Sequence, residues 1–201
     1  MSRKAKKSSI GAENVYEALQ CHKVCDKGLH KDFGALLKSG EGSDVALVVD
    51  GTKIRAHRLV LSARCEVFAR LLEHDKRTDI ELYDTTPEAL ACFVEYLYTD
   101  NCTLNLGNTV DVARLAHQYQ VDHVYRCAVK AFQLLLKPHC AILMWILAHK
   151  SALDDLIDAA EAYVLKNFFL TRSKFENNEL LLEYPDLMMK LLTSGKLSNR
   201  F

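Results

Sequence analysis

The strongest constraint on the fold is that strand-forming sequence occurs in only three short stretches, the first two separated by Asp50-Gly51. Residues 45–49 are a run of Val, Ala and Leu suited to a buried strand, and residues 53–56 follow the turn. An Asp-Gly pair favours a two-residue hairpin because glycine adopts positive φ without steric cost. Residues 79–83 alternate polar and apolar side chains and predict a third strand. So small a sheet has to be covered by helices.

Apolar residues recur at helical spacing through most of the remaining chain. The stretches with this spacing are residues 29–37, 59–72, 87–98, 108–119, 122–136, 140–150 and 153–167. Strand-like sequence is absent after about residue 133. The sequence therefore predicts an α+β domain over residues 27–132 and an all-α extension over residues 133–201. A basic segment, residues 1–26, precedes them and is expected to be flexible, with room for a short helix.

The charge distribution argues against a nucleic-acid-binding body. The chain has 26 basic and 26 acidic residues, but four of the bases lie within residues 3–7. Without those four, 22 bases face 26 acids, so the remainder carries a charge of about −4, whereas nucleic-acid binding needs a basic face. The basic tip itself is interpreted as a solvated tail, with a weak nucleic-acid contact or part of a nuclear-import signal as alternatives.

The cysteines and the hydropathy pattern predict a cytoplasmic or nuclear protein that does not enter a membrane. Seven cysteines are scattered, mostly among apolar neighbours, as in proteins that keep their thiols reduced. The longest apolar run, residues 140–148, is shorter than the roughly 18 residues that a membrane-spanning helix needs. An apolar signal-peptide core is not visible near the N-terminus.

The ordered motifs over residues 29–132 closely resemble the signature of BTB/POZ domains. They are Ser43-Asp44-Val45, Asp50-Gly51, residues 56–64, Val67-Phe68, residues 80–82, residues 86–90, residues 96–99, residues 115–121 and Cys127. The segment after residue 133 is similar to the start of the BACK domain, the helical extension that follows many BTB domains. By pattern the chain is similar to the speckle-type POZ proteins, which recruit a cullin-3-type ubiquitin-ligase scaffold. The resemblance implies a three-strand sheet covered by helices and followed by an all-α BACK-like (3-box type) extension.

The resemblance implies a homodimer interface on the leading helix. The matching residues are Leu29, Phe33, Leu36 and Leu37, which form one apolar stripe that has to be buried somewhere. The alternative is that the stripe covers the sheet of its own chain. Asp44 and Arg58 match a buried opposite-charge pair near the same interface, and the alternative is two half-exposed charges. His57 matches a packed, hydrogen-bonded structural histidine.

The resemblance also implies a cullin-binding surface. Leu71-Leu72-Glu73 matches the hydrophobic–any–Glu motif of adaptors that bind a cullin-3-type scaffold, with Leu71 entering an apolar groove and Glu73 meeting a basic or amide group. The alternative places both leucines in the core and Glu73 in solvent. Tyr125 and the segment around Asn101 are expected to extend this surface.

The function expected from these features is a non-enzymatic adaptor that homodimerises, recruits the scaffold and presents an unknown protein substrate for ubiquitination. Catalytic, cofactor-binding and metal-binding residues are not expected. One rival is a BTB dimerisation module for transcriptional regulation or scaffolding without a ligase role. Another is a metal-binding regulator that uses Cys21, His22, Cys25 and His30, although this spacing is incomplete for structural zinc. A third is a competitor that dimerises with longer BTB adaptors.

Overall fold

A computed structural model describes residues 28–173, 184–187 and 189, and its three-stranded sheet and many helices confirm the predicted α+β class. The elements, in chain order, are α2 (Gly28–Ser39), β1 (Val45–Val49), β2 (Thr52–Ala56), α3 (Arg58–Arg64), α4 (Glu66–His74), β3 (Asp79–Glu81), α5 (Pro87–Thr99), α6 (Thr109–Gln118), α7 (Asp122–Leu135), α8 (Ala141–Lys150), α9 (Asp154–Lys166) and α10 (Phe168–Ser173).

The predicted hairpin forms, and it sets the order of the sheet as β2-β1-β3. Asp50 and Gly51 both have positive φ, 48° and 76°, which matches the twist of a tight hairpin turn. β1 pairs antiparallel with β2 and parallel with β3, so that Leu47 lies between Ile54 and Ile80. A parallel partner needs a crossover connection, and α3 and α4 supply it.

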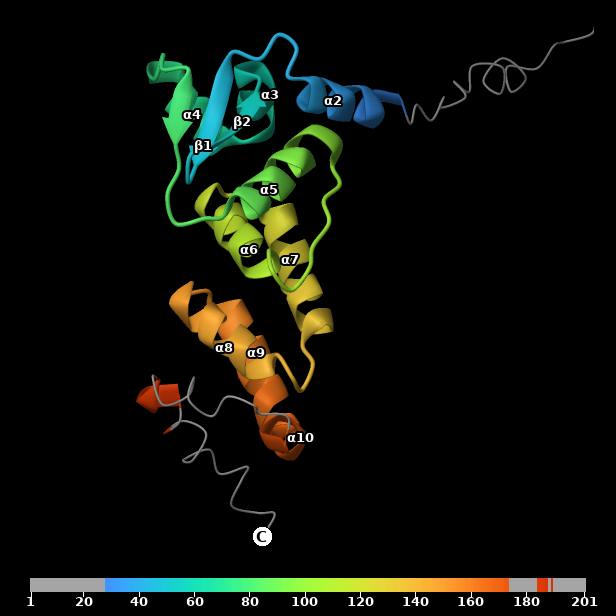
Figure 1. The fold of residues 1–201 in the computed structure, drawn as a ribbon, viewed down its shortest axis with the longest axis vertical. Coiled ribbons are helices and arrows are strands. Elements are labelled where there is room, and N and C mark those ends of the chain that lie inside the picture. Colours follow the sequence, from blue (N-terminus) through green and yellow to red (C-terminus); the bar gives the residue numbers. More distant parts are fainter. Residues whose placement is uncertain (1–27, 174–183, 188, 190–201) are drawn as a thin grey trace, which may run out of the picture.

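The elements are stacked along the long axis of the molecule (Figure 1). The sheet with α3 and α4 lies at one end, α5, α6 and α7 form the middle, and α8, α9 and α10 lie at the other end. α2 packs on α5 beside the sheet. α7 points from the middle towards the α8–α9 pair and contacts α9.

Two clusters of buried apolar residues hold this stack together. The first joins the sheet to α5 and contains Leu47, Phe68 and Phe93, each 0% exposed. The second surrounds Trp145 of α8, also 0% exposed, and includes Phe132 of α7. α7 therefore contributes to both clusters, because Val124 near its start belongs to the first cluster. The predicted division at residue 132/133 falls inside this helix and remains a prediction.

The single helix expected over residues 59–72 is divided in two, which corrects that expectation. Cys65 is extended, with φ −146° and ψ 115°, and separates α3 from α4. Its backbone N–H donates to Leu61 and closes α3, while its Sγ accepts a hydrogen bond from the N–H of Phe68 and caps α4. The break is set by the extended backbone and the two hydrogen bonds of Cys65, which the local apolar spacing does not reveal.

The expectations for residues 1–26 lie outside the described residues, as do those for most of residues 174–201. Within the described part of the chain, none of the helices is long and apolar enough to cross a membrane.

Candidate functional site

Helix α2 carries the predicted apolar stripe, but the protomer leaves it largely uncovered. None of its residues is buried. Phe33 and Leu37 pack partly against the first cluster, Leu36 is half-buried, and Leu29 remains 58% exposed. The stripe therefore covers its own chain only in part, so that apolar surface is left available for a partner.

A cavity of about 330 Å³ lies beside this stripe, between α2, α3 and the end of α5. Leu29 and Phe33 line it from α2, and Leu59 and Ala63 line it from α3. Leu59 is 80% exposed, which is unusual for a leucine next to a packed core. Leu59 was not among the residues predicted from the sequence to lie at an interface. The sequence does contain a signal for its exposure. Leu59 directly precedes Val60 in the helix after His57, and when Val60 faces inward its neighbour on the helix points to a different side.

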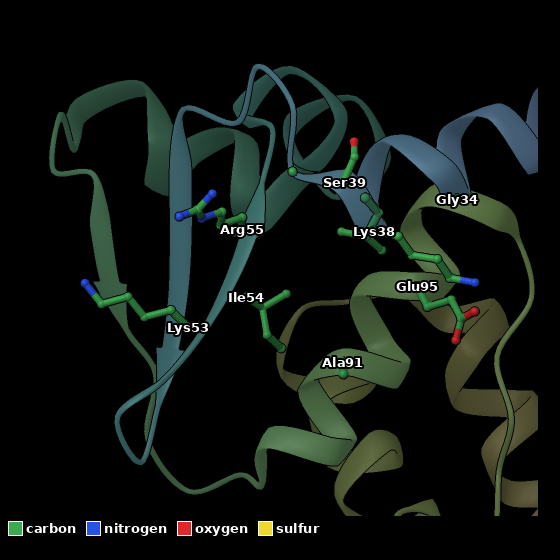
Figure 2. A pocket seen from close by; sticks show the side chains of 10 residues that line it. Gly34, Lys38, Ser39, Lys53, Ile54, Arg55, Ala91 and Glu95 are labelled. Atoms are coloured by element: carbon green, nitrogen blue, oxygen red, sulfur yellow. The ribbon is translucent and has the colours of Figure 1, made fainter.

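A second pocket, of about 520 Å³, lies between the last turns of α2, the edge strand β2 and α5 (Figure 2). Ile54 of β2 points towards Ala91 of α5, whereas Lys53 and Arg55 point away from it, as alternation along a strand requires. Lys53 forms an ion pair with Asp79. The outer face of the sheet is thus covered by charged side chains from both flanking strands.

The expected buried ion pair between Asp44 and Arg58 does not form within the protomer. Asp44 is exposed, and its Oδ1 accepts a 2.8 Å hydrogen bond from the backbone N–H of Arg58, at the start of α3. The guanidinium of Arg58 instead donates to the carbonyl oxygens of Leu72, Asp75 and Arg77. The last carbonyls of a helix lack intrahelical partners and carry partial negative charge, so they attract the cation away from Asp44.

His57 is held as a structural residue, as the resemblance implied. The Tyr98 hydroxyl accepts a 2.7 Å hydrogen bond from the backbone N–H of His57 and lies 2.9 Å from Nδ1 of the same residue. Nε2 lies 2.8 Å from the carbonyl oxygen of Glu41 and donates to it. Tyr98 therefore donates to Nδ1, and burial raises the pKa of its hydroxyl, which keeps the donor protonated.

The expected cullin-binding motif lies at the end of α4, with its three side chains in different environments. Leu71 is half-buried against the first cluster, and Glu73 is exposed. Leu72 is only 7% exposed and belongs to the core. The prediction that Leu72 forms part of the cullin-binding surface is therefore wrong. The physical reason is the helical repeat, because Leu72 lies four residues after the buried Phe68 and shares its inward face.

Tyr125 connects the first cluster to the helical extension rather than lying free on a surface. Its ring packs against both clusters, and its hydroxyl donates a 2.8 Å hydrogen bond to Asp155 of α9. Burial and the Asp155 carboxylate raise its pKa to about 12. Asn101 lies just beyond α5, and its side-chain amide donates to the carbonyl of Thr99 at 2.8 Å.

The predicted metal alternative is largely outside the described residues, since Cys21, His22 and Cys25 precede residue 28. Among the residues that the structure does describe, three or more His, Cys, Asp or Glu side chains are nowhere grouped so that they could hold a metal ion. His30 faces Asp100 across 3.9 Å on the surface.

Comparison with known proteins identifies the class of this α+β unit. The BTB/POZ domain model matches residues 33–134, half of the chain. The chain therefore belongs to the BTB/POZ domain family. It is 27% identical to a BTB/POZ domain-containing protein of Arabidopsis thaliana over 169 residues, 80% of this chain and 70% of that protein.

Two human relatives are longer than this chain. Kelch-like protein 22 is 27% identical over 188 residues, which are 92% of this chain and 28% of that protein. BTB/POZ domain-containing protein 9 is 38% identical over 99 residues, which are 45% of this chain and 16% of that protein. The chain thus spans less than a third of the length of either human relative, and the similarity to Kelch-like protein 22 extends beyond the BTB/POZ match into the helical extension.

Proposed function

We propose that this chain is a non-enzymatic adaptor that forms a homodimer and recruits a cullin-3-type scaffold to an unknown protein substrate for ubiquitination. Membership of the BTB/POZ family and the likeness to a Kelch-like protein support the adaptor role. The observation that carries the dimer is the uncovered apolar face, defined here as Leu29, Phe33 and Leu59 around the 330 Å³ cavity.

The apolar face suits a two-fold interface. In a two-fold dimer each copy offers the same surface, so one exposed leucine is buried twice. An apolar side chain at the rim of a cavity can enter the cavity of the second copy, while its own cavity receives the same side chain from that copy. Arg64 lines the same cavity and forms an ion pair with Asp100, which leaves polar groups at its edge. An apolar centre with a polar rim is the usual arrangement of a protein–protein interface.

Leu71 and Glu73 are the residues proposed to bind the scaffold. Both lie in the last turn of α4, and Arg58 fixes the position of that turn through its bonds to the carbonyls of Leu72 and Asp75. A half-buried leucine beside an exposed carboxylate can fill an apolar groove while the carboxylate accepts hydrogen bonds from the partner. Leu71 and Glu73 lie on α4, whereas the apolar face lies on α2 and α3. A second copy of the chain and the scaffold can therefore bind at the same time.

The scaffold contact is tested by Glu73→Lys, with Glu81→Lys as the matched control. Both carboxylates are exposed, so neither substitution is expected to disturb folding. Glu73→Lys is expected to weaken binding of a purified cullin-3 N-terminal domain at least tenfold, measured by biolayer interferometry, while Glu81→Lys leaves it unchanged. Leu71→Ala should give a similar loss, with circular dichroism verifying the fold.

Equal binding by wild type and both α4 variants would remove the ligase role. Dimerisation measured on the same samples is expected to persist in every case. A chain that dimerises but does not bind the cullin domain would instead be a BTB dimerisation module for transcriptional regulation or scaffolding.

A further inference from the structure

Two cysteines lie close together, one on α5 and one in the segment that follows it. Cys92 lies on α5 and is 7% exposed, and Cys102 lies beyond the end of the helix, half-buried against the same apolar cluster. The Sγ atom of Cys92 lies 3.4 Å from the carbonyl oxygen of Thr103, the residue next to Cys102. Each of the two thiols also shifts the pKa of the other, which rises for Cys92 and falls for Cys102. Both are present as free thiols.

The other described cysteines have different surroundings. The thiol of Cys65 donates to the carbonyl oxygen of Tyr119, and that of Cys140 lies near the carbonyl oxygens of Leu135 and Lys137. Cys127 is exposed on α7, with its Sγ 3.9 Å from a ring nitrogen of His123. Each of these three thiols therefore contacts a residue that does not adjoin another cysteine, whereas Cys92 contacts the residue next to Cys102.

We propose that Cys92 and Cys102 form an oxidisable dithiol that hydroperoxides convert to a reversible intramolecular disulfide. The pairing rests on proximity in the fold and is independent of any cullin or substrate contact. It is a modification site, because the bond would tie the segment after α5 to the helix. Leu104 in that segment packs against both apolar clusters, so the segment connects the two halves of the molecule.

The chemistry proceeds in two balanced steps. Cys102 reacts first because it is the more exposed thiol, and because its neighbour Cys92 lowers the pKa of Cys102, whereas Cys102 and burial raise the pKa of Cys92. The Cys102 thiolate attacks one peroxide oxygen, the O–O bond breaks, and a sulfenic acid and hydroxide form. The thiol of Cys92 then loses its proton to that hydroxide, which becomes water. The resulting Cys92 thiolate attacks the sulfur of Cys102 and expels a second hydroxide, which also becomes water on protonation. In total two thiols lose two electrons, and one hydrogen peroxide becomes two waters.

Peptide mapping tests the pairing on the full chain. The sequence has no Lys or Arg between Arg77 and Arg114, so trypsin releases Cys92 and Cys102 within one peptide, residues 78–114. The folded protein is treated with increasing hydrogen peroxide, remaining thiols are blocked with N-ethylmaleimide, and the digest is analysed by mass spectrometry. The expected product is peptide 78–114 lighter by two hydrogen atoms and without maleimide. Dithiothreitol should restore a peptide that accepts two maleimides.

Cys127 and the variant Cys102→Ser provide the controls. Cys127 falls in a separate tryptic peptide and sets the peroxide dose at which an exposed single thiol is oxidised. Cys102→Ser is expected to abolish the lighter peptide completely. The proposal is overturned if peptide 78–114 still takes two maleimides at a dose that oxidises Cys127, or if it gains oxygen atoms at one cysteine while the other stays alkylated.

Discussion

Replacing Leu59 by alanine is expected to weaken self-association about 50-fold without destabilising the protomer. Burying a leucine fully contributes about 2 kcal/mol, and Leu59 still has 80% of its surface exposed. Alanine keeps one of the four side-chain carbons of leucine. The substitution therefore loses about three quarters of the free energy gained by burying that exposed surface, which is about 1.2 kcal/mol per copy. A two-fold interface contains the residue twice, which gives about 2.4 kcal/mol, and each 1.4 kcal/mol is tenfold in Kd.

The assay is sedimentation equilibrium over a dilution series that spans the monomer–dimer transition. Leu134→Ala is the matched control, because Leu134 lies on a helix surface at 77% exposure and outside the 330 Å³ cavity. The control should have the wild-type Kd. If both alanine variants dimerise as tightly as wild type, the apolar face does not mediate self-association and the reasoning from its exposure is wrong.

Two further predictions concern the contacts that hold the surfaces in place. Arg58→Met should lower the free energy of unfolding by about 2 kcal/mol in urea titrations, because the carbonyls of Leu72 and Asp75 at the end of α4 and of Arg77 in the following loop lose a charged donor. Met at the exposed Arg70 should cost little. Tyr125→Phe should cost about 0.5–1 kcal/mol by removing the hydrogen bond to Asp155. Since folding raises the pKa of Tyr125 to about 12, this contribution is full below the unfolded pKa of about 10 and is lost as the pH rises through 12. Wild type and the phenylalanine variant should therefore converge in stability at high pH, and a gap that stays constant would contradict the assignment.

The sheet was predictable from sequence because its signals are local. The Asp50-Gly51 pair fixes the turn, and the β-branched run that precedes it fits only a buried strand. The parallel pairing of β3 with β1 was not predictable by the same means. The position at which β3 begins is set by the path of α3 and α4, and this path changes direction at the break at Cys65.

The candidate surfaces were predictable in position but not in every residue. The apolar stripe of α2 follows from helical spacing, while its exposure depends on how little of α2 the rest of the chain covers. Leu71 and Leu72 are equivalent in the sequence pattern, and only the packing of α4 distinguishes the buried Leu72 from its neighbour. Arg58 shows the same limit, because its acceptors are carbonyls at the end of a helix 14 residues or more along the chain.

The mass of the complex between this chain and a purified cullin-3 N-terminal domain decides whether the chain is a dimeric adaptor. Light scattering coupled to size-exclusion chromatography measures that mass in solution. We predict one particle that contains two chains of 22.8 kDa each and two cullin domains. A particle with one copy of each, or two components that elute separately, would contradict it.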